Sequence, residues 1–331
     1  MTTSIHIRQL VRRLESSKRG LALLIVSSVL FLSFGQTTSA QEDWPFWRGP
    51  NFNGTSTATD LPDKWKPKGG TDSNLVWKNT DVGGRSTPVA FAGKLYLLSR
   101  HARETSEERE KLVCLDAKTG ETLWENTFNV WLSDVPDTRV GWSSPTVDPE
   151  TGNVYALGVC GLFMCVDGET GKTIWSIPMH EYFGLLSTYG GRTNFPVIAD
   201  DLVIISGVII GWGENSKPAH QFIGFNKNNG EIHWIQGTHP QPHDTNYSSP
   251  TLTTIDNQKA LVVGSGDGNI WALQTGTGKP IWHYKFSRRA LNVSPLVVGD
   301  TVYSGHSEEN LTGTAMGAVA SIKLSGKGDI T

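Results

Sequence analysis

The stretch CLDAKTGETLW, residues 114–124, contains a short apolar strand, a polar turn and a second strand that ends in tryptophan. The same arrangement returns three times, as CVDGETGKTIW at 165–175, GFNKNNGEIHW at 224–234 and ALQTGTGKPIW at 272–282. A fifth copy, IKLSGKGDIT, covers residues 322–331. A repeat of about 50 residues is typical of β-propellers and of arrays of helix pairs.

The residues between the copies decide between these two architectures. Each repeat opens with a β-rich run around a proline and continues with a second run rich in Val, Ile, Leu and Tyr; the prolines are Pro88, Pro145, Pro196, Pro250 and Pro295. Turn residues separate the runs, and no repeat has a helical pattern of useful length. The sequence therefore predicts an all-β fold, a β-propeller whose blades are four-stranded antiparallel sheets.

The turn of each copy has its own chemistry. Asp116 and Asp167 are expected to accept hydrogen bonds from N–H groups two residues on. Four residues later a glycine supplies a positive φ, at Gly120, Gly171, Gly230 and Gly278. Asn226 can replace the aspartate, whereas Gln274 and Leu324 are not equivalent to it.

A tryptophan closes each hairpin. These residues are Trp124, Trp175, Trp234 and Trp282, and Trp77 in NLVWKNT (74–80) resembles them. One large flat ring per blade suits a wedge between adjacent sheets. Stacking on a ligand is the alternative, but recurrence in every blade favours the structural role.

The spacing Ala-x-Asp-x-x-x-Gly-x-x-x-Trp resembles the tryptophan-docking motif of PQQ-like (quinoprotein-type) β-propeller repeats, from about residue 75 to the end. The leader DWPFWRGPNFNG, residues 43–54, is similar to the opening of bacterial PQQ-binding-like propeller proteins. That class includes BamB-type scaffolds and, more distantly, quinoprotein alcohol dehydrogenases. The resemblance implies a longer chain, so that these blades are a fragment of a seven- or eight-bladed ring.

Two interpretations of ring closure follow from residues 74–80. Their strand either completes the fifth blade, giving five blades, or belongs to the larger ring. GKGDIT (326–331) reads as the start of the fifth blade's own fourth strand, which favours the larger ring. The predicted domains are a signal peptide at 1–40, a leader segment at 41–74, and a propeller at 75–331. The propeller comprises an N-terminal closing strand, four complete blades and most of a fifth.

Residues 1–40 have the layout of a secretory signal. Basic residues precede the apolar run 21–34, and small residues lead to Ala40. The run is short for a membrane span, which needs about 20 residues. We expect a periplasmic or secreted protein with no stable membrane span after signal removal; an uncleaved anchor is the alternative.

The net charge of the chain excludes one class of function, and the positions of its cysteines indicate their chemical state. The net charge of −3 argues against a nucleic-acid binder, which needs a basic stripe. The three cysteines, Cys114, Cys160 and Cys165, are expected to be buried thiols, because two of them occupy equivalent places in neighbouring sheets.

Loops that precede the first strands, together with those between second and third strands, should share one face. They are rich in aromatic residues and arginine, which suits an anionic or planar ligand or a partner peptide. The predicted ligand funnel consists of Trp142, Arg192, Asn194, Tyr247 and Asn292. Ordinary surface loops with a few packing aromatics are the alternative.

The sequence does not support catalysis. The resemblance implies that an enzyme of this class has a pair of adjacent cysteines, a catalytic Asp and Ca²⁺-binding acids, none of which can be assigned here. HPQPH (239–243) beside Asp244 offers too few ligands for zinc. No catalytic, cofactor-binding or metal-ligating residue is predicted.

The predicted function is therefore an exported non-catalytic scaffold that binds a protein partner or surface ligand through its loops, with no nucleic acid and no cofactor. The alternative is a divergent PQQ-dependent oxidoreductase that uses PQQ with Ca²⁺. Carbohydrate binding through the aromatic loops is a third possibility.

Overall fold

A computed structural model describes residues 43–59, 61–70, 73–130, 139–186, 194–209, 220–238 and 246–331. The chain divides into two compact units, Met1–Glu42 and Asp43–Thr331, and the described residues all belong to the second. The predicted signal peptide, residues 1–40, lies outside the described residues.

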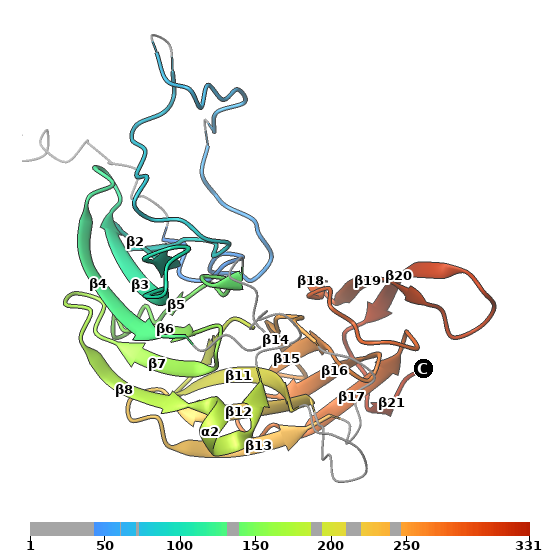
Figure 1. Cartoon of the computed structure of the whole chain (residues 1–331). Helices are drawn as coiled ribbons and strands as arrows, with labels where there is room; N and C mark the ends of the chain where they lie inside the picture. Colours follow the sequence, from blue (N-terminus) through green and yellow to red (C-terminus); the bar gives the residue numbers. More distant parts are fainter. Residues whose placement is uncertain are drawn as a thin grey trace, which may run out of the picture. The chain divides into compact units, whose positions relative to one another are not determined.

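The described residues form five sheets that follow the order of the sequence (Figure 1), with one short helix, α2 (Met179–Phe183). The first sheet contains β1 (Val89–Phe91), β2 (Lys94–His101), β3 (Arg109–Asp116) and β4 (Thr122–Asn129). The second contains β5 (Thr146–Val147), β6 (Val154–Leu157), β7 (Leu162–Val166) and β8 (Thr173–Pro178). The third contains β10 (Val197–Ala199), β11 (Leu202–Ile209), β12 (His220–Asn226) and β13 (Ile232–Gly237), with β9 (Leu185–Leu186) paired to β11.

The fourth sheet contains β14 (Thr251–Ile255), β15 (Gln258–Gly264), β16 (Asn269–Gln274) and β17 (Pro280–Lys285). The fifth contains β18 (Leu296–Val298), β19 (Thr301–Glu309) and β20 (Met316–Lys323). In each sheet these strands pair with their neighbours in chain order and antiparallel. The prediction of four-stranded antiparallel propeller blades is therefore confirmed.

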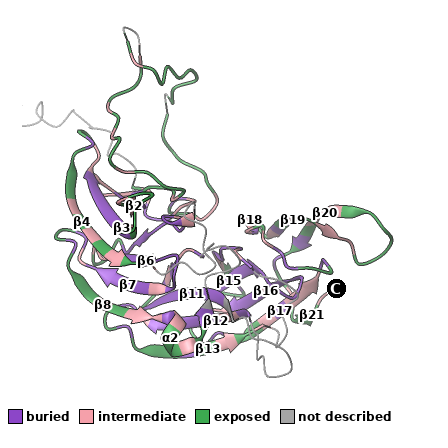
Figure 2. Cartoon of the chain, viewed as in Figure 1, coloured by how far each residue is buried: buried purple, intermediate pink, exposed green. Residues whose placement is uncertain are grey.

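Each sheet buries one face against the next sheet along the chain. Leu98 and Cys114 of the first sheet, for example, pack with Ala156 and Met164 of the second. Equivalent clusters join the second sheet to the third, the third to the fourth and the fourth to the fifth. Figure 2 shows the consequence: β7, β11 and β16 are largely buried. In β4, β8 and β13, by contrast, exposed residues alternate with residues that are half-buried or buried.

The turn between the third and fourth strands has the predicted chemistry. The Asp116 carboxylate accepts hydrogen bonds from the backbone N–H groups of Lys118 and Thr119, at 2.9 and 2.8 Å. These donors lower the pKa of Asp116, because they stabilise its charged form. Asp167 and Asn226 make the same pair of bonds in the next two sheets.

The tryptophan of each hairpin docks on the turn of the following sheet. The indole N–H of Trp124 donates to the carbonyl of Gly168 at 3.0 Å, and its ring lies over Gly171. The same N–H···O=C bond recurs between other sheets, with the pairs Trp175–Lys227, Trp234–Thr275 and Trp282–Leu324. The predicted wedge is thus also a hydrogen-bonded dock, and its acceptor is always a main-chain carbonyl of the turn.

A β-bulge directs these rings. In each of the first four sheets the register between third and fourth strands shifts immediately before the tryptophan, as between Cys114 and Leu115. The bulge leaves the preceding residue, Leu123 in the first sheet, without a pairing partner and half exposed, at 49%. Because a bulge bends and twists its strand, it turns the following side chain toward the neighbouring sheet.

Two of the predicted strands, one at residues 74–80 and one starting in residues 326–331, are wrong. Residues 74–80 have no strand, although Trp77 does occupy a docking position: it donates to the carbonyl of Ala117 at 3.0 Å and covers Gly120. GKGDIT does not begin the fourth strand of the fifth sheet. Its strand β21 (Gly328–Asp329) pairs in parallel with β17 of the fourth sheet instead. The turn there begins at Leu324, which has no carboxylate to accept the turn N–H groups.

The leader, residues 43–54, contacts the inner strands of several sheets. The backbone of Trp44 pairs with Ala90 in β1, and the carbonyl of Pro45 accepts the N–H of Val147 in β5. Phe46 is 2% exposed and belongs to the cluster between the third and fourth sheets. The Arg48 guanidinium donates to the carbonyls of Ser294 and Pro295, which precede β18. One short segment thereby ties the first sheet to the fifth.

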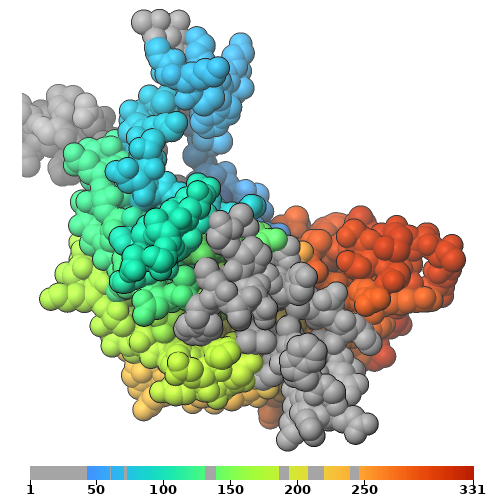
Figure 3. All heavy atoms as spheres, viewed as in Figure 1, coloured from blue at the N-terminus to red at the C-terminus, as the bar shows by residue number. Residues whose placement is uncertain are grey.

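The residues after the leader differ sharply from it. Residues 55–59 and 61–68 are exposed throughout, including Leu61 at 67% and Trp65 at 73% (Figure 3). We call 55–76 the arm. Among the described residues no helix is long and apolar enough to cross a membrane.

Candidate functional site

The residues just before the first strands form a hydrogen-bonded band that we call the collar: 84–88, 141–145, 194–196, 246–250 and 291–295. Serine side chains of one sheet bind the backbone of a neighbouring sheet. The N–H of Thr87 donates to Ser144 Oγ at 2.9 Å, and the N–H of Ser249 donates to Ser294 Oγ at 2.8 Å. The collar fixes where the loops of this face begin.

Four of the five predicted funnel residues lie in the collar, and the structure gives them different surroundings. Asn194 is 1% exposed and donates from Nδ2 to Ser206 Oγ at 2.6 Å, so it braces the protein interior instead of facing a ligand. Tyr247 and Asn292 are half-buried neighbours, because the N–H of Tyr247 donates to Asn292 Oδ1 at 3.2 Å.

Trp142 is the funnel residue with the most distinctive environment. It is half-buried, and the guanidinium carbons of Arg139 and Arg85 lie 4.9 and 5.8 Å from the centre of its ring. Both distances are within the range of cation–π attraction. Trp142 therefore combines an aromatic surface with two positive charges.

The remaining loop predictions fall partly outside the description. Arg192 and the segment HPQPH lie outside the described residues. Arg288 and Arg289, in the loop before β18, hold the connection between β19 and β20: Arg288 binds the carbonyl of Leu311, and Arg289 pairs with Glu309 at 3.1 Å.

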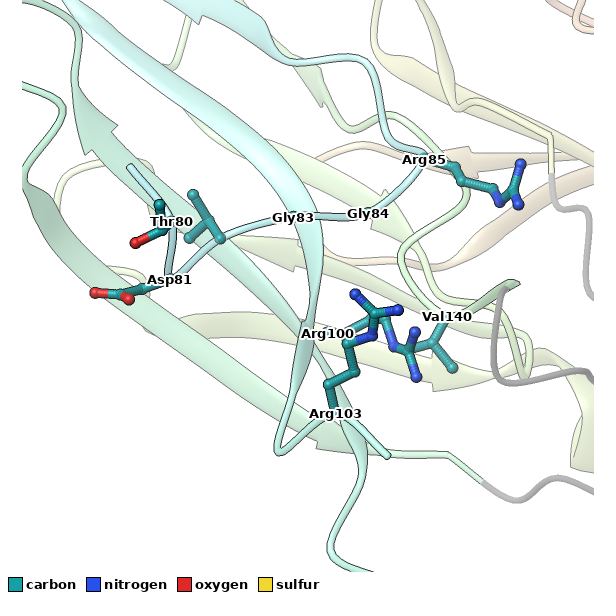
Figure 4. Close-up of a pocket in the computed structure, with 9 residues that line it drawn as sticks. Thr80, Asp81, Gly83, Gly84, Arg85, Arg100, Arg103 and Val140 are labelled. Carbon is teal, nitrogen blue, oxygen red and sulfur yellow. The ribbon is translucent and has the colours of Figure 1, made fainter. Parts of the chain in front are cut away.

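A cavity of about 530 Å³ opens beside the first sheet. We call it the arginine pocket; its lining consists of Thr80, Asp81, Val82, Gly83, Gly84, Arg85, Arg100, Arg103 and Val140 (Figure 4). These residues come from the segment before β1, the end of β2 and the loop before β5. The loop contribution places the pocket next to Trp142 on the collar.

Two of the three arginines in the pocket form ion pairs, one of them buried and the other exposed. Arg100 pairs with Glu108 at 2.5 Å, and both side chains are only 8% exposed, so this guanidinium has a fixed position. Arg103 pairs with Glu104 at 3.0 Å in solvent, with 67% of its side chain exposed. An exposed ion pair of this kind contributes about 0–1 kcal/mol and exchanges readily.

Sequence reasoning missed this pocket. Arg100 and Arg103 belong to the segment RHARETSEEREK (100–111), and Arg85 stands in a collar position next to a glycine pair. Their one sequence signal is a cluster of arginines at a strand end and a first-strand start of the same repeat. The pairing of β1 with β2, continued by the hydrogen bond from the Arg100 N–H to the Gly83 carbonyl, brings the two groups together.

A buried carboxylate supports the pocket from behind. Glu110 in β3 is 0% exposed, and its two oxygens accept the N–H groups of Gly141 at 2.9 Å and Val159 at 2.7 Å. Burial raises the pKa of Glu110 to about 7, and the two backbone donors oppose that rise. Glu110 thus ties the first sheet to the second and fixes the residue beside Val140 and Trp142.

Stability near neutral pH should depend on Glu110. Its folded pKa lies above the ordinary 4.5, so its favourable contribution is complete below pH 4.5 and is lost as the pH rises through about 7. Each pKa unit is worth about 1.4 kcal/mol, so the loss is about 3 kcal/mol. Replacing Glu110 with glutamine should remove this dependence while weakening one backbone hydrogen bond at every pH. Urea unfolding followed by circular dichroism, over a series of pH values, measures both effects.

The matched control is Glu121→Gln, since Glu121 is exposed in the next turn of the same hairpin. The buried His220 titrates in an overlapping range, because burial lowers its pKa to about 4. The effect of Glu110 is therefore taken from the difference in free energy of unfolding between variant and parent at each pH, in which the contribution of His220 cancels. An unchanged pH slope in Glu110→Gln would contradict the assignment.

The described residues contain no group of three or more His, Cys, Asp or Glu side chains that could hold a metal ion. Cys114, Cys160 and Cys165 are free and buried, as predicted, and burial raises the pKa of Cys114 and of Cys165 to about 12. Such thiols are unreactive, so these cysteines serve packing.

Comparison with known proteins gives a family match over most of the chain. The model of the family described as "Outer membrane protein assembly factor BamB" matches residues 68–148 and 129–324. A quinone alcohol dehydrogenase, dehydrogenase subunit, of Gluconobacter oxydans (strain 621H) is 25% identical over 236 residues, which are 64% of this chain and 30% of the relative. The outer membrane protein assembly factor BamB of Shewanella oneidensis is 20% identical over 249 residues, 70% of this chain and 54% of the relative.

Among solved structures, BamB from Moraxella catarrhalis has a TM-score of 0.47 and 17% identity, with 74% of this chain and 62% of that chain covered. The chain thus spans a third to just over half of the length of the two curated relatives it matches.

Proposed function

Because the chain belongs to the family described as outer membrane protein assembly factor BamB, we propose that it is an exported, non-catalytic β-propeller that holds a partner protein on its collar face. Export would use residues 1–40 as a signal peptide and place the protein in the periplasm or outside the cell. The partner would be a component of outer membrane protein assembly, as the family description suggests.

The observation that carries this proposal is the arginine pocket beside Trp142. Its lining comes from three separate segments, and fixed groups support two of them: Glu108 holds Arg100, and Glu110 holds Gly141 beside Val140. A pre-formed, supported pocket of this size suits a side chain or short peptide of a partner. Among the described residues, no metal-binding group accompanies it.

Site-specific photo-crosslinking in the cell that produces the protein tests the proposal. A photoreactive residue at Arg85 or Tyr247 should give the same partner adduct, identified by mass spectrometry. The matched control is Asn153, in the turn between β5 and β6 at the other end of the strands, which should not give that adduct. Equal adducts from all three positions, or none from Arg85 and Tyr247, would rule out partner binding on this face.

A second candidate function is PQQ-dependent alcohol oxidation, favoured by the similarity to the Gluconobacter oxydans dehydrogenase subunit. It would require PQQ and Ca²⁺, for which the described residues offer no metal-binding group. Dialysis of the full chain after incubation with PQQ and Ca²⁺ separates the two candidates. Retained quinone absorbance together with dye-linked alcohol oxidation would replace the scaffold proposal.

A further inference from the structure

The charge of the arginine pocket is unusual for this chain. Three guanidinium groups, those of Arg85, Arg100 and Arg103, line it, while the whole chain has a net charge of −3. Asp81 is the one acidic lining residue, and Glu108 and Glu104 pair with Arg100 and Arg103. Figure 4 shows the guanidinium groups of Arg100 and Arg103 close to one another beside Val140, with the Asp81 carboxylate pointing away from them. Carboxylates are therefore the groups that these guanidiniums already bind within the chain.

We propose that the arginine pocket binds the carboxylates of a short acidic segment of the partner protein. This inference rests on the proposed scaffold function, which it deepens by naming the chemistry that the partner supplies. Arg100 would be the fixed anchor, and Arg85 and Arg103 the exposed arginines that close on the incoming carboxylates. Guanidinium–carboxylate bonds are charge-assisted and orient the ligand through two parallel N–H···O contacts.

The chain itself shows the type of contact. Both Arg100 and Arg103 already bind glutamates of the 102–108 turn, namely Glu108 and Glu104. The pair with Glu104 is exposed on both sides, at 67% and 63%, so a partner carboxylate can replace Glu104 at small cost. Ala102 and Glu104 have φ values of 48° and 63°, so the backbone on both sides of Arg103 is left-handed. That conformation costs energy for residues other than glycine, and here it presents Arg103 at the pocket.

Size and net charge favour a peptide over a polyanionic surface. A pocket of about 530 Å³ admits a few side chains, and Val82 and Val140 offer apolar walls for the methylene groups of glutamate. The net negative charge of the chain weakens long-range attraction of nucleic acid or anionic lipid. A small pocket lined by arginines, one of them in an exposed and exchangeable ion pair, on a negative chain therefore suits a short acidic segment.

Fluorescence anisotropy with the full chain and a labelled hexaglutamate peptide tests the inference, with hexaglutamine as the uncharged comparison. Hexaglutamate should bind, and added salt should weaken it. The double variant Arg85→Ala/Arg103→Ala should lose at least about tenfold in affinity, since one charge-assisted bond is worth about 1.5–3 kcal/mol. Both side chains are exposed, and the unfolding midpoint checks that the variant is folded.

The matched control is Arg109→Ala, because Arg109 is 45% exposed in the same turn region and does not line the pocket. It should change the affinity less than twofold. Arg103→Lys should bind more weakly than the parent but more tightly than the double variant, because lysine keeps the charge and loses the planar fork.

Three results would overturn the inference: equal binding of hexaglutamine, unchanged affinity in the double variant, or binding of phosphatidylglycerol vesicles without binding of the peptide. Its failure is distinct from failure of the scaffold function. If the crosslinks from Arg85 and Tyr247 persist while hexaglutamate does not bind, the scaffold function stands and the acidic segment is excluded. If hexaglutamate binds but no crosslink forms, the pocket chemistry stands without the partner.

Discussion

Replacing Trp234 with alanine is expected to lower the free energy of unfolding by about 3–5 kcal/mol. Trp234 is 8% exposed, packs in the cluster between the third and fourth sheets and donates to the carbonyl of Thr275 at 2.9 Å. The substitution removes the ring, leaves a cavity between two sheets and strands a buried carbonyl. Urea unfolding followed by far-ultraviolet circular dichroism measures the change, because this signal does not depend on the number of tryptophans.

The control is the same substitution at an exposed tryptophan. Trp65 in the arm is 73% exposed, so Trp65→Ala should change stability by less than about 0.5 kcal/mol. Equal effects of the two substitutions would show that the indole does not lock the sheets together.

Replacing Gly171 with alanine should destabilise the second sheet through a direct clash. Gly171 has a φ of 70°, and a Cβ placed there would lie 2.5 Å from the ring of Trp124. The positive φ alone costs about 1–2 kcal/mol for alanine. Because the indole is fixed by its hydrogen bond to Gly168, the sheets must also separate, and we expect a total loss of about 3 kcal/mol or more.

Gly152→Ala separates the two contributions within the same sheet. Gly152 has a φ of 74°, but nothing lies within 4 Å of the position its Cβ would take. This variant should therefore show the backbone cost alone. Thermal unfolding of both variants compares them, and equal losses would mean that the contact with Trp124 adds nothing to the strain of the backbone.

The blades could be predicted because their determinants are local. Asp116, Gly120 and Trp124 lie within one hairpin, and the turn chemistry that they specify forms wherever the spacing recurs. Gln274 shows how much the spacing tolerates: it lacks a carboxylate, yet the turn keeps the backbone bond from the Gly278 N–H to the Gln274 carbonyl.

The two incorrect strands lacked such determinants. Residues 74–80 have the apolar pattern of a fourth strand, but a strand exists only where another strand pairs with it, and the sequence pattern does not specify that partner. Gly328 has a φ of 70° with nothing packed against it, so its turn lacks the indole that covers the equivalent glycines.

Site residues were harder to predict than the fold because loop contacts depend on several repeats at once. Placing Trp142 and Tyr247 in the collar followed from their distance to the strand prolines, and both are half-buried there. Asn194 lies two residues before its proline, whereas Trp142 and Tyr247 lie three residues before theirs, and it is buried because it binds Ser206 of β11. The arginine pocket also needed Val140 from the loop before β5, which belongs to the next repeat and is not visible in a single repeat.

The contacts of Arg48 determine the order in which the leader can dock on the sheets during translation. Its carbonyl acceptors lie 246 and 247 residues downstream, so they emerge long after Trp44 and Pro45 can reach β1 and β5. The early hairpins can therefore fold one by one during translation. The contact of Arg48 with Ser294 and Pro295 forms only after the fifth sheet has been synthesised, and it closes a very long loop. A nascent chain arrested before residue 294 should hold its leader at the first four sheets, through Trp44, Pro45 and Phe46, and remain open to proteases at Arg48.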